Sequence, residues 1–89
     1  MVYLVTYDLN KPGKDYSTLY AAIRRYDFIR DNGLDSVWFV STSWTAAQIY
    51  EHLRLYLDVG DRILITQMTS GTHQGWMHKD IWNWINARL

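Results

Sequence analysis

The first eight residues, MVYLVTYD, constrain the fold more than any other segment of the chain. Residues 2–7 are apolar, aromatic or β-branched on both of their alternating faces, and the loop-forming stretch LNKPG follows Asp8 directly. A strand that is apolar on both faces is usually covered on both sides and lies inside its sheet. The sequence therefore predicts a central strand over residues 2–8 that ends in an acidic residue.

The segment after the loop is predicted to form a helix. Apolar side chains recur there at the spacing of one helical face, at Tyr16, Leu19, Tyr20 and Ile23. This spacing predicts a helix over residues 16–26. Asp15 precedes the helix and is expected to accept hydrogen bonds from the free backbone N–H groups of its first turn.

The dipeptide Asn32-Gly33 predicts a β-hairpin. It favours a type I′ turn, which needs positive φ angles at both central residues. We expect a short strand over residues 28–31 before this turn and a longer strand over residues 35–42 after it.

The second half of the chain repeats the pattern of helix and strand. Thr45, followed three residues later by Gln48, is typical of a capping box and predicts the start of a second helix. Its apolar face should consist of Ala46, Ile49, Tyr50, Leu53 and Leu57. Gly60 is expected to end this helix. The apolar run over residues 62–68 predicts another strand inside the sheet, and residues 76–89 predict a last short helix.

The order β-α-β-β-α-β followed by a helix predicts a single α+β domain of the ferredoxin-like type over residues 1–89. Two right-handed β-α-β crossovers joined by a hairpin give a four-stranded antiparallel sheet with both crossover helices on one face. The first and third strands would be central, which agrees with the apolar character of residues 2–8. The opposite face of the sheet would need the last helix or a second subunit as cover.

Composition narrows the location and the partners of the protein. The chain has no cysteine, which excludes disulfides and thiolate metal sites and fits a cytoplasmic protein. No apolar run reaches the ~18–20 residues that span a bilayer. The N-terminus lacks the pattern of a signal peptide, so we expect no membrane partner. The formal net charge is zero, so any nucleic acid would have to bind to a local patch.

Large aromatic residues are abundant for so short a chain, with five Trp and seven Tyr. A domain of this size has a thin core, and rings that the core does not need would form an exposed patch. Because interfaces favour aromatic residues at their centres, we expect a homodimer. The C-terminal residues Trp76, Trp82 and Trp84 are expected to pack in a core or dimer seam rather than to stack with bases.

Asp8 has two interpretations on the residues alone. As a turn residue, it would accept hydrogen bonds from the N–H groups of the LNKPG loop. As a metal ligand on a rigid strand, it would bind Mg²⁺, which usually takes one or two carboxylates and keeps several waters, with substrate phosphate completing its shell. One aspartate per chain is too little for such a site, whereas two from a dimer are enough.

Basic residues follow Asp8 at two places. Lys11 and Lys14 lie in the loop directly after it, and Arg24 and Arg25 lie in the last turn of the first predicted helix. Together they are candidates for a small patch that contacts the phosphates of a nucleic acid. The alternative is that they are solvated side chains of a loop and a helix end.

The remaining titratable residues are weaker candidates. His73 and His78 flank QGWM and have the chemistry of an acid–base pair, but nothing in the sequence positions them together. His52 is expected at the surface of the second helix. We expect the hairpin to carry its own acids away from Asp8, namely Asp27, Asp31 and Asp35.

The string VTYDLNKPG resembles the opening of the CRISPR-associated protein two family and of its relatives, the virulence-associated D proteins and a set of short SinR-like proteins. The residues that carry the match are Tyr7, Asp8, Leu9, Asn10, Pro12 and Gly13, then SVWFVST at 36–42 and GDRILI at 60–65. The pair YD alone carries little information, whereas the longer string points to the SinR-like branch.

The resemblance implies a ferredoxin-like domain that dimerises. Members of the CRISPR branch are described as metal-dependent nucleases or as structural subunits of the complex that integrates spacers. In the nuclease interpretation, the aspartate after the first strand of each subunit meets its mate across the two-fold axis, and both hold Mg²⁺. Here that residue is Asp8. The CRISPR branch often ends in a strand that pairs with the partner subunit, whereas this chain is predicted to end in a helix.

Two functional hypotheses follow. In the first, the protein is a dimeric, Mg²⁺-dependent nuclease of RNA or DNA, endoribonuclease-like, with Asp8 as catalytic residue and metal ligand. In the second, it is a non-catalytic dimeric module that binds a protein or a nucleic acid in an antiviral defence, toxin or mobile-element setting. The resemblance favours the first, while the neutral net charge and the single candidate acid favour the second.

Overall fold

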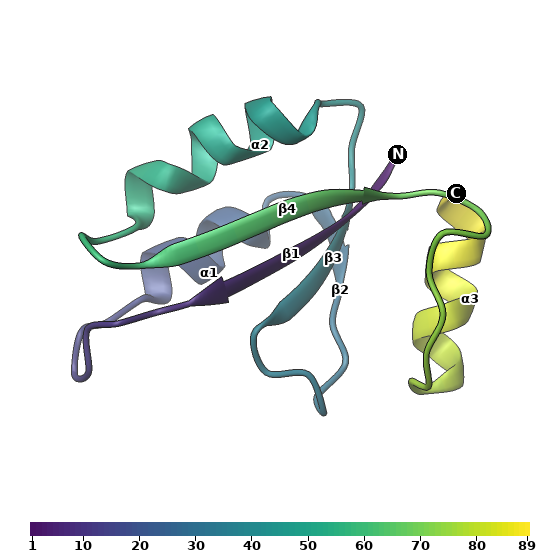
Figure 1. Ribbon diagram of the computed structural model, residues 1–89, viewed down its shortest axis with the longest axis horizontal. Helices are drawn as coiled ribbons and strands as arrows, with labels where there is room; N and C mark the ends of the chain where they lie inside the picture. Colours follow the sequence, from purple (N-terminus) through teal and green to yellow (C-terminus); the bar gives the residue numbers. More distant parts are fainter.

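The computed structural model describes all 89 residues and shows a four-stranded antiparallel sheet with three α-helices (Figure 1). Along the chain, the elements are β1 (Val2–Asp8), α1 (Ser17–Ile23), β2 (Asp27–Ile29), β3 (Val37–Ser41), α2 (Ala46–Leu53), a short 3₁₀ helix η1 (Arg54–Tyr56), β4 (Arg62–Met68) and α3 (Lys79–Arg88). The strand order in the sheet is β2-β3-β1-β4. The predicted ferredoxin-like arrangement with an added C-terminal helix is confirmed. None of the helices has the length and apolar character needed to cross a membrane.

Strand β1 is central, as its two apolar faces predict. It pairs antiparallel with β3 on one side and with β4 on the other. The prediction that residues 62–68 also lie inside the sheet is wrong, because β4 pairs only with β1 and forms an edge. The apolar residues of β4 point to both faces of the sheet. Ile63 and Ile65 pack against the main core, whereas Leu64 between them is 59% exposed on the other face.

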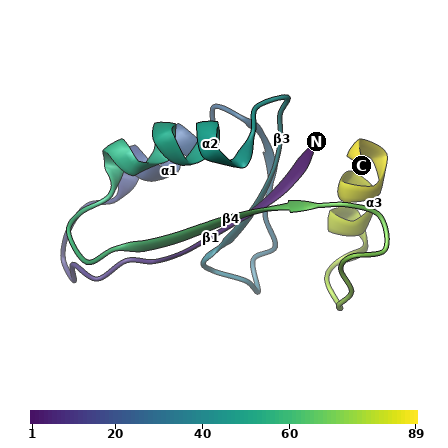
Figure 2. The same cartoon turned by 45° about the horizontal axis from the view of Figure 1, so that its top comes forward.

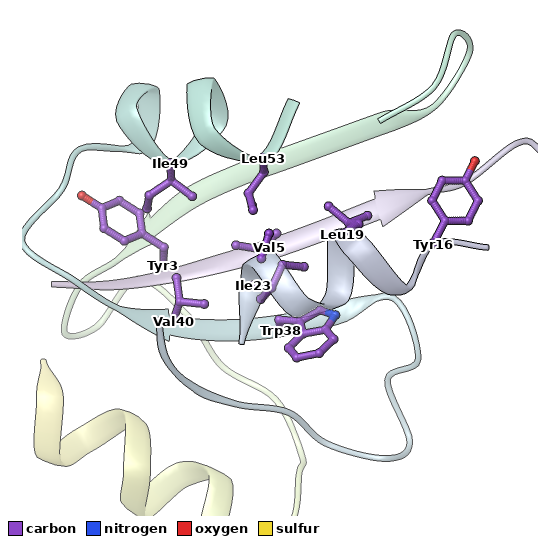
Figure 3. Packing of buried hydrophobic residues seen from close by; sticks show 10 residues of the cluster. Tyr3, Val5, Tyr16, Leu19, Ile23, Trp38, Val40, Ile49 and Leu53 are labelled. Carbon is purple, nitrogen blue, oxygen red and sulfur yellow. The ribbon is translucent and has the colours of Figure 1, made fainter. Parts of the chain in front are cut away.

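Helices α1 and α2 lie together on one face of the sheet and enclose the main core (Figure 2). Tyr3 and Val5 of β1 meet Trp38 and Val40 of β3 from the sheet side, as the close view in Figure 3 shows. Together with the smaller Ala22, the helices contribute four large aliphatic side chains that are almost completely buried: Leu19, Ile23, Ile49 and Leu53. Large rings therefore supply much of the buried area of this thin core, as expected for a short chain.

Helix α3 covers only one end of the opposite face. Its Ile81 and Ile85 are buried against the β-strand residues Val2, Phe39 and Met68. Both chain termini lie at this same end of the sheet (Figure 1). The other end of the face is left without a covering element. We call it the open sheet face and define it by Thr6, Asp8, Arg62, Leu64 and Thr66, all of them half-buried or exposed.

The hairpin exists, but its predicted turn type is wrong. No residue except Gly13, Gly60 and Gly71 has a positive φ angle, so Asn32-Gly33 does not form a type I′ turn. The strands are also shorter than predicted, and a loop over residues 30–36 separates them. The Asp31 side chain organises this loop, because its Oδ1 accepts a hydrogen bond from the Gly33 N–H at 2.7 Å. An Asx-type turn has replaced the tight hairpin turn.

The first helix ends earlier than predicted, at Ile23 rather than near residue 26. Its last turn tightens, since the Arg25 N–H donates to the Ala22 carbonyl three residues earlier, and this sends the chain into β2. At the other end, Asp15 accepts a hydrogen bond from the Ser17 N–H at 2.8 Å, as predicted, although the N-cap position itself is Tyr16, whose side chain makes no capping bond.

The capping box of α2 is confirmed. The Thr45 hydroxyl accepts from the Gln48 N–H at 3.2 Å, and the Gln48 side chain accepts from the Thr45 N–H at 2.9 Å. The helix ends at Leu53 and continues as η1, rather than running to Gly60. The prediction of an inward-facing Tyr50 is wrong, since this side chain is 44% exposed.

Candidate functional site

Asp8 is the last residue of β1 and lies directly across from Arg62 of β4. Side chains alternate along a strand, so Asp8 shares its face with Thr6 and not with the residues that pack under α1 and α2. Its side chain is exposed. The fold therefore presents this carboxylate on the open sheet face.

The interpretation of Asp8 as the turn residue of the LNKPG loop is wrong. Its carboxylate accepts no hydrogen bond and forms no ion pair within the chain, whereas Asp61 fills that structural role. Asp61 accepts from the Asn10 N–H at 2.8 Å and the Asp58 N–H at 2.7 Å. The Tyr16 hydroxyl also donates to it, at 2.8 and 2.9 Å from its two oxygens. The carboxylate that fixes the loop thus comes from the start of β4.

The pKa of Asp61 reflects this role. Partial burial raises the pKa of this carboxyl, but hydrogen bonds from the Asn10 and Asp58 N–H groups and from the Tyr16 hydroxyl outweigh burial and lower it below its usual value. Asp61 is therefore ionised and fully engaged at neutral pH. Sequence reasoning missed it, although the carboxylate between Gly60 and an apolar strand was a visible signal.

A shallow hollow of about 270 Å³ surrounds Asp8, lined by Thr6, Tyr7, Asp8, Arg62, Ile63 and Leu64. Arg62 brings a guanidinium to the same face as the carboxylate without forming an ion pair with it. Sequence reasoning missed Arg62 as well, because only the register of β1 against β4 places it opposite Asp8. Nowhere in the chain do three or more His, Cys, Asp or Glu side chains gather as a metal site.

The acids of the hairpin differ in their distance along the sheet from the end of β1. The Tyr7 N–H donates to the Ser36 carbonyl at 3.3 Å, so the hairpin loop lies beside the C-terminal end of β1. Asp27 is at the far end of the sheet, opposite Ser41. Asp31 lies in the loop but is engaged, since it accepts from the N–H groups of Gly33 and His78. Asp35 precedes Ser36 in this loop, and its side chain has no hydrogen-bond or ion-pair partner in the chain.

The four basic candidates fall into two separate pairs. Lys11 and Lys14 lie before α1, and Arg24 and Arg25 lie after it, so the helix, about 10 Å long, separates them. Lys14 is paired with Asp58 at 3.1 Å. Arg24 lies over the Trp38 ring at 5.4 Å from the ring centre. The Arg25 side chain has no hydrogen-bond or ion-pair partner in the chain.

The three histidines make different contacts. His73 stacks on Trp82 with ring centres 6.0 Å apart, and its Nδ1 is buried without a hydrogen-bond partner. His78 precedes α3, where its Nδ1 accepts from the Asp80 N–H at 3.3 Å. His52 is not a simple surface residue, because its Nδ1 lies 2.7 Å from the Tyr26 hydroxyl.

The C-terminal tryptophans differ in burial. Trp82 and Trp84 pack against the apolar cluster between α3 and the sheet, as predicted. Trp76 does not, and it is 93% exposed. Beside it, a hollow of about 220 Å³ opens between the loop before α3 and the sheet.

No protein-family model matches the chain. The site must therefore be interpreted from its own chemistry. It offers one free carboxylate and one free guanidinium on an uncovered sheet face, with a second acid in the adjoining loop.

Proposed function

We propose that the protein is a homodimeric, nuclease-like protein that binds Mg²⁺ through Asp8 of two chains and acts on RNA or DNA. The observation that carries the proposal is the position of Asp8: exposed at the end of a rigid central strand, on the open sheet face, without any partner in its own chain. A carboxylate with no structural task is available as a ligand. The resemblance of VTYDLNKPG to the CRISPR-associated protein two family supports the same residue.

The donor chemistry fits a magnesium ion only if two chains contribute. Mg²⁺ binds one or two carboxylates, several waters and the phosphate of its substrate. Asp8 supplies one oxygen donor group per chain, so two chains would supply a suitable set. When bound, such an ion would lower the pKa of a coordinated water and neutralise charge on the phosphate.

The residues of this chain would supply the rest of the site. Arg62 would pair with a phosphate oxygen, because a guanidinium matches that geometry with two hydrogen bonds. Leu64 and Thr6 would form part of the contact between the two chains, since an uncovered sheet face with an exposed leucine is suited to packing against its own copy. The dimer would then bring the two Asp8 side chains together.

The test is a cleavage assay with labelled single- and double-stranded RNA and DNA in millimolar Mg²⁺. We expect the wild type to cleave at least one of them, EDTA to stop cleavage, and Asp8→Asn to lose it. Asp80→Asn is the matched control, because it removes another exposed carboxylate, which lies on α3. Arg62→Gln should weaken substrate binding and lower the salt slope of binding by about one.

A second candidate is a non-catalytic dimeric module that binds a protein or a nucleic acid. It is favoured by the guanidinium of Arg62 opposite Asp8, which would compete with a cation for the carboxylate, and by the lack of any cluster of three metal-binding side chains. In this case the wild type cleaves none of the substrates, and its melting temperature does not respond to Mg²⁺. The same assay, read together with a thermal melt, separates the two candidates.

A further inference from the structure

A second site lies at the opposite end of the sheet from Asp8. Two adjoining hollows of about 440 and 430 Å³ share the side chains of Trp44 and His52. The larger one is lined in addition by Arg25 and Tyr26, which follow α1, and by Asp27, Ser41 and Thr42. Ser41 pairs with Val2 at the start of β1, so the length of that strand, about 20 Å, separates these hollows from Asp8.

Trp44 presents a partly exposed ring to these hollows. Its backbone is held in place, because its carbonyl accepts a hydrogen bond from the Tyr3 hydroxyl at 2.7 Å and its backbone N–H donates to the Thr42 hydroxyl at 3.2 Å. The rings of Tyr26 and His52 approach it edge to face, each at an interplanar angle of 81°. Neither ring stacks parallel to the indole, and Trp44 stays 45% exposed. The exposed part of the indole is available to stack on a planar ligand.

The charges around the hollows leave one free cation. Asp27 is engaged by Arg88 at 2.7 Å, and Glu51 is engaged by Arg54 at 2.8 Å. Arg25 lines the larger hollow and has no partner in the chain. Because the acids are paired and Arg25 is not, the site attracts an anion.

His52 adds a neutral hydrogen-bonding group. Burial, and then the nearby charge of Arg25, lower the pKa of His52, so its imidazole is neutral at pH 7. Burial also raises the pKa of Tyr26, so this hydroxyl stays protonated, and it shares a hydrogen bond of 2.7 Å with Nδ1 of His52. The other ring nitrogen, Nε2, has no partner within the protein.

We propose that these hollows bind a nucleoside phosphate unit of a single-stranded nucleic acid, with its base stacked on Trp44 and its phosphate held by Arg25. An exposed aromatic face beside an unpaired guanidinium is the combination that single-strand binding surfaces use. A volume of this order is that of a small-ligand site. His52 Nε2 supplies one further hydrogen-bonding group to the phosphate, the sugar or the base. The site needs no metal ion and no second chain.

The probe is a fluorescently labelled single-stranded octanucleotide, as RNA and as DNA, titrated with the protein at low salt in EDTA. EDTA makes the result independent of Mg²⁺ and hence of the function proposed for Asp8. A free nucleoside monophosphate, tested as a competitor, distinguishes a mononucleotide site from a strand-binding site. A labelled duplex is the third arm, since a paired base cannot reach Trp44.

We expect the wild type to bind a single strand more tightly than the duplex. Trp44→Ala and Arg25→Gln should each weaken binding about tenfold, and Arg25→Gln should also lower the salt slope by about one. Lys79→Gln is the matched charge control and Trp76→Ala the matched aromatic control, because both residues are exposed and line neither hollow. Both controls should bind as the wild type does.

The inference is overturned if Trp44→Ala and Arg25→Gln bind the single strand as tightly as the wild type. It is also overturned if the duplex binds equally well or if none of the strands binds. Arg25→Gln changes an exposed side chain without a structural partner and should fold normally. It therefore keeps the test decisive if Trp44→Ala is unstable, and circular dichroism spectra of all variants verify their folding.

Discussion

At the residue scale, the carboxylates of this chain divide into structural and free ones. Asp61 is the main structural one, since it joins the loop after β1 to the start of β4 and to Tyr16. Asp8 and Asp35 are free. Their positions in the sequence do not show which aspartates are structural, because an aspartate next to a strand end can either fix a loop or stay free. The hydrogen bonds in the structure show it directly.

The lowered pKa of Asp61 predicts how stability depends on pH. A carboxyl whose pKa is lower in the folded than in the unfolded state stabilises the fold above its unfolded value of about 3.9, and this contribution is lost as pH falls through the folded pKa. The pKa values of Asp15, Asp31 and Asp58 are also lowered, each chiefly by a hydrogen bond from a backbone N–H. We therefore expect the melting temperature to decline gently as pH falls from about 7 to 5, because the lowered pKa of His52 keeps it neutral in the fold while the unfolded chain takes up a proton near its ordinary pKa of about 6.5, and to fall steeply below about pH 4.

Asp61→Asn tests the share of this one residue. At pH 7 the amide loses the charge-assisted hydrogen bonds and should lower the melting temperature by roughly 5 °C. The difference from the wild type should shrink as pH falls below about 4, because the wild-type carboxyl is then protonated as well. Asp35→Asn, which removes a free carboxyl, is the control. Parallel pH profiles for Asp61→Asn and the wild type would contradict the role given to Asp61.

At the element scale, the sequence predicted the order and type of the four strands and the three α-helices but not η1, because each of those seven elements has a periodic pattern or a cap. The capping box of α2 and the bounds of β4 needed only local residues. The edge position of β4 did not follow from its composition, because Ile63 and Ile65 pack under the helices while Leu64 faces outward. Leu64 is exposed because α3 covers only the other end of its face, and the docking position of α3 depends on the tertiary structure.

The prediction of a type I′ turn was wrong because Gly33 does not adopt a positive φ angle, and this can be tested. Gly60 has a φ angle of +87°, which strains any residue with a side chain, whereas Gly33 has no positive φ. Gly60→Ala should therefore lower stability by about 1 kcal/mol or more. Gly33→Ala should change it by less, since an added Cβ meets only the Asp31 carboxylate at 3.2 Å. Chemical denaturation measures both, and equal losses would favour the rejected type I′ turn.

The packing of α3 on the sheet predicts a large stability loss when its buried side chain is shortened. Ile85 is fully buried against the sheet, so Ile85→Ala should cost about 2–5 kcal/mol. Asn83→Ala is the control on the same helix, because this side chain is exposed and should change stability by no more than about 0.5 kcal/mol. Urea unfolding compares the two variants. A loss of under 1 kcal/mol for Ile85→Ala would mean that α3 is not firmly held on the second face.

At the scale of the whole molecule, the sheet has three kinds of surface: one face under α1 and α2, one end under α3, and the open sheet face that carries Asp8. The sequence predicted that the second face needs cover and that Asp8 ends a central strand. It could not predict that Arg62 stands opposite Asp8, or that Trp44, His52 and Arg25 converge. Residues so far apart in the chain meet only through strand register and helix packing.

The central claim is that two chains share one metal ion through Asp8. Its most direct measurement is a titration with Mn²⁺, a substitute that also prefers oxygen ligands, in which electron paramagnetic resonance counts the free ion. The account predicts one bound ion per two chains for the wild type and none for Asp8→Asn, with sedimentation of the same samples showing a dimer. One ion per chain, a monomer that binds the ion, or equal binding by Asp8→Asn would contradict it.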